Sequence, residues 1–174
     1  NKIKKLETLT DDFNYDGVTL AKAKFSENRL LFLSPILKED IHISGVSNLN
    51  IKVASSKKAV NLSVWLVSLP WNSEKNAKIT DNIITRGWAD IQNHKSLRES
   101  KALIPGKFYQ MSFNLEPDDQ VIKKGQQIGL MIFSSDSEFT LHPKPGTKLT
   151  VDINTSSLEL PIVGGNKSLK RAFK

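Results

Sequence analysis

Apolar and polar residues alternate with a period of two over short stretches of the chain. Leu49, Ile51 and Val53 are separated by Asn50 and Lys52. Runs of the same kind occupy 29–34, 40–45, 60–69, 77–89, 108–116, 126–135, 147–153 and 156–164. A period of two is the spacing of side chains on one face of a strand, so these runs predict half-buried antiparallel strands.

Turn-forming residues separate the runs. The separating segments are LSP, ISG, LPWN, IPGK, EPDD, KKGQ, HPKPG and VGG. In EPDD, Pro117 has the fixed φ that suits the first corner of a turn. The strands recur without a long amphipathic helix between them, which favours two packed sheets over a βαβ arrangement. We therefore predict an all-β fold, a jelly-roll β-sandwich of about eight or more antiparallel strands.

The length of 174 residues suits one domain with a core of its own. Residues 1–28 keep no period and are expected to form a lead-in segment, followed by the sandwich over 29–165. The basic tail, 166–174, is expected to form a short helix. Because the first residue is Asn and not Met, we expect the chain to be a fragment of something longer.

The net charge is +7, but its distribution argues against a nucleic-acid partner. Lysines are scattered singly or in pairs among acidic residues, and aromatic residues do not alternate with basic ones. No apolar run approaches the roughly 20 residues that span a membrane, so no membrane partner is expected.

The chain has no cysteine, which excludes disulfides, thiolate metal sites and cysteine nucleophiles. We expect a cytoplasmic location, where thiols stay reduced.

The sequence shows little catalytic chemistry. It has no G-x-S-x-G nucleophile elbow, phosphate loop or H-E-x-x-H motif. His42, His94 and His142 lie far apart without a second ligand nearby, so we expect no metal site, and we expect no cofactor. The acidic residues Asp118, Asp119 and Asp136 are expected to cap turns.

The segment RGWADIQNH, 86–94, gathers polar groups within a short stretch. Without a nucleophile beside them these residues lack the logic of a triad, so we interpret them as loop or interface residues. The candidates are Arg86, Trp88, Asp90, Asn93 and His94. Trp88 is expected to end a strand, and Gly87 to let the backbone bend there. The spacing of Arg86 and Asp90 suits a local ion pair that braces the turn.

The chain resembles the C-terminal domain of the Xaa-Pro dipeptidyl-peptidases. The segments that carry the resemblance are 84–97, 61–67, 105–152 and 160–165. The wider family includes cocaine esterase and α-amino-acid ester hydrolase. The family pattern R-G-W-x-D-P-Q-N is matched by Arg86, Gly87, Trp88, Asp90, Gln92 and Asn93, whereas Ile91 stands where proline is common. The resemblance covers about residues 25–165.

The resemblance implies a parent serine exopeptidase that releases an N-terminal Xaa-Pro dipeptide from a peptide. Its Ser-Asp-His triad is expected on an α/β-hydrolase domain that precedes this one, so we expect this chain alone to be inactive. The resemblance also implies a galactose-binding-like, non-catalytic domain that packs on the catalytic domain and supports structure or substrate access. The implied partners are that catalytic domain and, in a homodimer, a second subunit.

Two other functions stay open. The first is a carbohydrate-binding module of jelly-roll type, for which Trp71 in the loop LPWNSEK is the candidate platform. The second, with the least support, is a free-standing enzyme.

Overall fold

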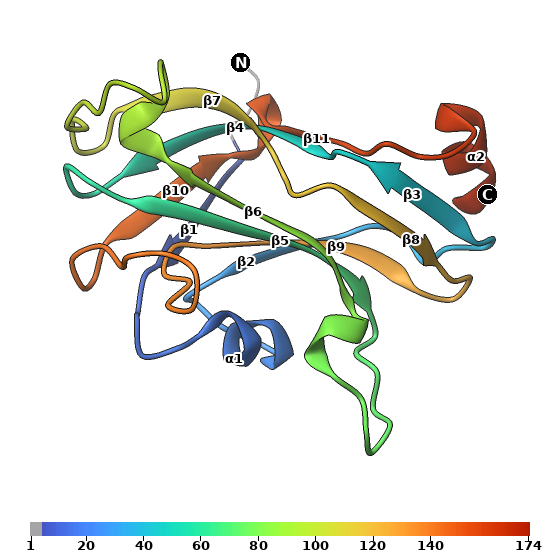
Figure 1. Ribbon diagram of the computed structural model, residues 1–174. Helices are drawn as coiled ribbons and strands as arrows, with labels where there is room; N and C mark the ends of the chain where they lie inside the picture. The colour runs from blue at the N-terminus through green and yellow to red at the C-terminus, as the bar shows by residue number, and fades with distance from the viewer. Residues whose placement is uncertain (1–4) are drawn as a thin grey trace.

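Two antiparallel sheets lie face to face in the computed structural model, which describes residues 5–174 (Figure 1). The first sheet has the order β1 (Leu6–Thr10), β10 (Lys148–Asp152), β4 (Asn48–Ser55) and β7 (Phe108–Asn114), and β11 (Ser157–Glu159) also pairs with β4. The second sheet has the order β2 (Leu30–Leu33), β9 (Gln127–Phe133), β5 (Asn61–Leu69) and β6 (Ile83–Asp90). A separate ribbon pairs β3 (Ile41–Gly45) with β8 (Asp118–Ile122). The predicted all-β sandwich is confirmed, and every predicted run contains a strand.

Strand β5 is buried on both of its faces. Leu62 and Leu66 belong to the main core between the two sheets. Trp65 and Val67 point the other way and pack in a second apolar cluster. Helix α1 (Gly17–Lys22) covers that outer face (Figure 1). The alternation therefore predicts the inward face correctly, while the burial of the outward face depends on a helix distant in sequence.

The first 28 residues contribute to the sandwich as well as leading into it. Strand β1 pairs with β10, and its Leu9 is fully buried. Asp16 is the N-cap of helix α1, and its Oδ1 accepts the Thr19 N–H at 2.7 Å. Gly17 lets the helix approach the sheet closely, because a Cβ there would lie 2.4 Å from Cζ2 of Trp65.

Strand β6 differs from its predicted form. It runs to Asp90, so Trp88 does not end it, and its pairing with β5 is regular at Gly87. The predicted bend at Gly87 is therefore wrong. The missing side chain makes room for Leu115 instead, since a Cβ would lie 2.4 Å from Leu115 Cδ2. The first part of the predicted run forms the short 3-10 helix η1 (Ile79–Asp81).

The prediction that Asp118 and Asp119 cap a turn is also wrong. Both residues are the first residues of β8, opposite Gly45 and Ser44 of β3. The Asp119 side chain hydrogen-bonds the His42 ring across the ribbon. Pairing with β3 thus turns a polar segment into a strand.

The predicted C-terminal helix is confirmed as α2 (Gly165–Ala172). Ala172 is buried, and its carbonyl accepts the Lys38 N–H at 2.7 Å. Arg171 adds an exposed ion pair with Glu39, with 3.4 Å between Nε and Oε2. Within residues 5–174, no helix combines the length and apolar character needed to cross a membrane.

Candidate functional site

Five side chains form a cluster on the outer face of the second sheet. We call it the cation–aromatic cluster and define it as Trp65, Arg86, Trp88, Asp136 and Phe139. Trp65 and Arg86 are register partners on β5 and β6. The Arg86 Cζ lies 4.6 Å from the Trp65 ring centroid and 5.1 Å from that of Phe139. Both rings therefore attract the guanidinium through their π faces.

A buried carboxylate joins the two tryptophans of the cluster. Asp136 is 1% exposed, and its Oδ2 accepts the indole N–H of Trp65 and that of Trp88, each at 3.0 Å. Trp88 in turn stacks on Phe139 with ring centroids 5.0 Å apart. Phe139 stays 49% exposed, so it forms the outer edge of the cluster.

Sequence reasoning missed both Asp136 and Phe139 as members of this cluster. Asp136 does lie in a turn, where its main-chain carbonyl accepts the Phe139 N–H at 2.8 Å. In the part of the chain that the structure describes, its carboxylate accepts from the two indoles and not from a turn N–H, so the turn-capping prediction is wrong for its side chain. No local pattern links position 136 with Trp88, because the pairing of β5 with β9 brings them together.

The predicted ion pair between Arg86 and Asp90 is wrong. The two residues are four apart on a strand, which separates them by about 13 Å. Asp90 instead caps the 3-10 helix η2 (Ile91–Asn93), its Oδ1 accepting the Gln92 N–H at 2.9 Å. The Nε of Arg86 is buried and has no hydrogen-bond partner among the described residues.

The next polar residues hold the loop after β6 against the sandwich. Gln92 Oε1 accepts the Val60 N–H at 2.9 Å, just before β5 starts. Asn93 donates to main-chain carbonyls within the loop. His94 packs its ring against Tyr109 with centroids 4.7 Å apart. These contacts hold the loop in place against β5 and β7.

Asp11 ties the N-terminal segment to the loop that carries Asp136. It is 3% exposed, and its carboxylate accepts the main-chain N–H of Ser135 at 2.8 Å and the Ser135 hydroxyl at 2.9 Å. Burial raises the pKa of Asp11 above its usual 3.8, although the Ser135 hydrogen bonds act in the opposite direction. Asp12 also raises this pKa, and His142 lowers it.

Trp71 has contacts within the domain. It is half-buried beside the second apolar cluster, and its indole N–H donates to the Ala21 carbonyl at 3.0 Å. A sugar platform needs an accessible aromatic face with polar groups around it. The contact with α1 gives Trp71 a packing role at the end of β5.

The histidines are separate in space as they are in sequence. His42 contacts Asp119, and His142 stacks on Phe13 with centroids 4.8 Å apart. In the part of the chain that the structure describes, no three or more His, Asp or Glu side chains gather where they could hold a metal ion.

Comparison with known proteins agrees with this architecture. The fold is similar to part of an α-amino acid ester hydrolase of known structure, with a TM-score of 0.72 at 15% identity. The likeness covers 91% of this chain and 32% of that one. The likeness shows that the two proteins share this β-sandwich fold.

The model of the X-Pro dipeptidyl-peptidase C-terminal non-catalytic domain matches residues 2–170, and the chain belongs to this family. A protein of Rhodopirellula baltica named as a Xaa-Pro dipeptidyl-peptidase is 60% identical over 164 residues, which is 94% of this chain and 26% of that protein. A Bacillus cereus protein of the same name is 42% identical over 136 residues, which is 78% of this chain and 22% of that protein. The chain therefore spans about a quarter of the length of these relatives.

Proposed function

We propose that this chain is the accessory domain of a longer serine peptidase, called the parent below, which releases N-terminal Xaa-Pro dipeptides from peptides. The observation that carries the proposal is the family match over residues 2–170 in a chain that spans about a quarter of relatives named for that activity. In the parent, the triad lies on a separate α/β-hydrolase domain, and this domain packs on it.

The surroundings of the histidines support a non-catalytic role. A serine triad needs a serine hydroxyl hydrogen-bonded to a histidine that a third group orients. The hydrogen bonds of the His42, His94 and His142 rings go to Asp119 and to the main-chain carbonyls of Ile91 and Pro143, and none involves a serine.

The segment 86–94 braces the domain in this proposal. Asp90, Asn93 and His94 serve as loop residues, because their side chains are already engaged within the loop or against β7. Arg86 and Trp88 stabilise the outer face of the second sheet through the cation–aromatic cluster. Their effect on peptide cleavage is indirect, through the shape of the domain.

We also propose a jelly-roll topology of the galactose-binding-like kind. The supporting feature is that each sheet interleaves early and late strands, β1-β10-β4-β7 in one and β2-β9-β5-β6 in the other. A chain that folds double and wraps into a sandwich produces this order. We propose a cytoplasmic location for the parent on the ground that this domain has no cysteine.

The experiment compares three proteins on a chromogenic Xaa-Pro substrate: the parent, the parent without this domain, and this chain alone. We expect turnover by the parent, reduced turnover or reduced stability after removal of the domain, and no turnover by the chain alone. Turnover by the chain alone that is lost in His94→Ala would overturn the proposal. Full activity and unchanged stability of the shortened parent would do the same.

A further inference from the structure

An apolar cleft opens between the two sheets, away from the cation–aromatic cluster. Its volume is about 210 Å³. Leu49 and Ile51 of β4, Val151 of β10 and Ile132 of β9 form its buried floor. An apolar cavity of about 150 Å³ already holds a benzene-sized group, so this cleft has room for one aromatic or branched aliphatic side chain.

The cleft exists because the chain leaves the first sheet and returns to it. Strand β10 pairs with β4 over 53–55, and β11 pairs with it over 48–50. Between them the chain forms the 3-10 helix η3 (Ile153–Thr155), so Ile51 and Lys52 have no strand partner on this side within residues 5–174. The gap leaves the interior of the sandwich open at that point.

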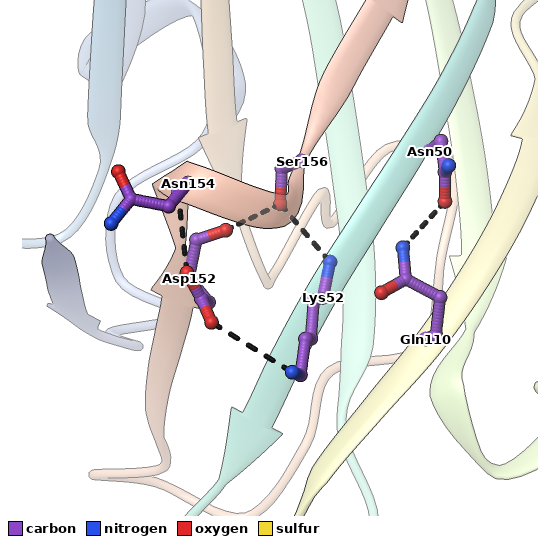
Figure 2. A network of polar contacts seen from close by, with 6 residues as sticks. All are labelled: Asn50, Lys52, Gln110, Asp152, Asn154 and Ser156. Carbon is purple, nitrogen blue, oxygen red and sulfur yellow. Dashed lines mark hydrogen bonds and ion pairs between the residues drawn. The ribbon is translucent and has the colours of Figure 1, made fainter. Parts of the chain in front are cut away.

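The polar groups around the gap are hydrogen-bonded or ion-paired with one another (Figure 2). The Ser156 hydroxyl accepts the Lys52 main-chain N–H at 3.1 Å and donates to the Asp152 carbonyl at 2.8 Å. The Asp152 carboxylate accepts the Asn154 N–H at 3.2 Å and pairs with the Lys52 ammonium at 3.8 Å. Ser156 thus replaces the missing strand partner, and the opening is a defined feature of the fold.

The entrance of the cleft is apolar and incompletely covered. Phe32, Leu130, Ile153 and Leu158 line the cleft and are only half-buried. Covering apolar surface that is otherwise exposed to water is favourable. The entrance therefore favours an apolar occupant.

We propose that the cleft receives one leucine- or phenylalanine-sized side chain from the catalytic domain of the parent. The inference rests on the function proposed above. Three quarters of the length of the relatives lies outside the matched region, which is described as C-terminal. Lys5, which leads into β1, accepts the Ile153 N–H on its carbonyl at 3.0 Å. The start of β1 thus lies beside the entrance of the cleft.

The first measurement uses the absence of native cysteines from this domain. Ser157 lines the cleft and is exposed, and Ser100 is an exposed serine in the loop before β7. We would introduce Ser157→Cys or Ser100→Cys into the full-length parent and follow thiol labelling by peptide mass spectrometry. We expect labelling at position 157 to be at least tenfold slower than at position 100. Equal rates would overturn the proposal.

The second measurement separates insertion of a side chain from flat coverage. Leu158→Trp fills the cleft from its edge, and Val121→Trp on β8 is the matched control at a half-exposed strand position. In the parent, Leu158→Trp should split one unfolding transition into two, while Val121→Trp should leave one. A single, unshifted transition in Leu158→Trp would refute insertion.

The outcomes also separate this inference from the proposed function. If removal of the domain impairs the parent but position 157 labels freely, the accessory role stands and the cleft does not carry the contact. Free labelling together with uptake of benzene would instead make the cleft a small-molecule site, and this too would overturn the inference.

Discussion

The Asp136 carboxylate accepts the indole N–H of Trp88 at 3.0 Å, across 48 positions of sequence. The same oxygen accepts the Trp65 N–H at the same distance. One buried acceptor thus fixes two indoles on neighbouring strands, and the loop after β9 is anchored to the outer face of the second sheet.

Replacement of Asp136 should destabilise the domain strongly. Asp136→Ala leaves two indole donors without their acceptor, and each buried donor left unpaired costs about 1–3 kcal/mol. We expect the unfolding free energy to fall by about 2–5 kcal/mol, measured by urea denaturation followed by tryptophan fluorescence. Asp119→Ala removes only an exposed contact with His42, so it should have a much smaller effect and serves as the control. Equal losses in the two variants would show that Asp136 does not hold the cluster.

Arg86 should be coupled energetically to Phe139 and not to Asp90. Its guanidinium lies against the Phe139 ring, and such contacts contribute about 0.5–2 kcal/mol. A double-mutant cycle of Arg86→Gln with Phe139→Leu should therefore give a coupling energy of that size. The matched cycle of Arg86→Gln with Asp90→Asn should give none. Coupling of Arg86 to Asp90 and not to Phe139 would support the local ion pair and contradict the contact between Arg86 and the Phe139 ring.

The sequence predicts the inward faces of the strands well because the period of two is a local property. Leu62 and Leu66 follow from it without knowledge of the partner sheet. The burial of Trp65 on the opposite face depends on α1, which approaches it only through Gly17. Strand β8 was missed because it starts with two aspartates, and only its pairing with β3 makes it a strand.

The candidate site likewise has some residues that the sequence indicates and others that only the fold brings together. The motif at 86–94 indicates Arg86 and Trp88, but their partner Asp136 comes from a loop whose position depends on the β5–β9 register. The cleft beside η3 has no sequence signature, since it follows from where β10 and β11 leave and rejoin β4. Long-range register is the information that a single sequence lacks.

Gly87 should tolerate no side chain. A Cβ at this position would lie 2.4 Å from Leu115 Cδ2 and 3.1 Å from Leu115 Cα, and the second contact is with the main chain. Overpacking of this kind costs about 1–3 kcal/mol, so Gly87→Ala should lower the melting temperature. Addition of Leu115→Ala should make the double variant less destabilised than the sum of the single changes. If the effects of Gly87→Ala and Leu115→Ala on stability are strictly additive, the strain caused by Gly87→Ala does not come from contact with the Leu115 side chain.

Asp11 should make the domain less stable as the pH rises through the acid range. Its pKa is raised in the folded chain, so the folded state holds the proton more tightly than the unfolded state does. The Asp11 contribution to the unfolding free energy is therefore highest below the usual pKa of 3.8, decreases up to the raised pKa, and is constant above it.

Asp11→Asn removes this titration and keeps a group that can accept and donate to Ser135. Asp12 and His142, the titratable groups that act on Asp11, are present in both proteins, so the difference between wild type and variant reports Asp11 together with its coupling to these two groups. The unfolding free energy of the wild type minus that of Asp11→Asn should decrease as the pH rises past the usual pKa of 3.8 and level off above the raised pKa, as measured by urea denaturation at each pH. A difference that increases with pH would contradict the prediction. It would mean that the Ser135 hydrogen bonds lower the pKa of Asp11 by more than burial raises it, so that the folded state favours the ionised carboxylate.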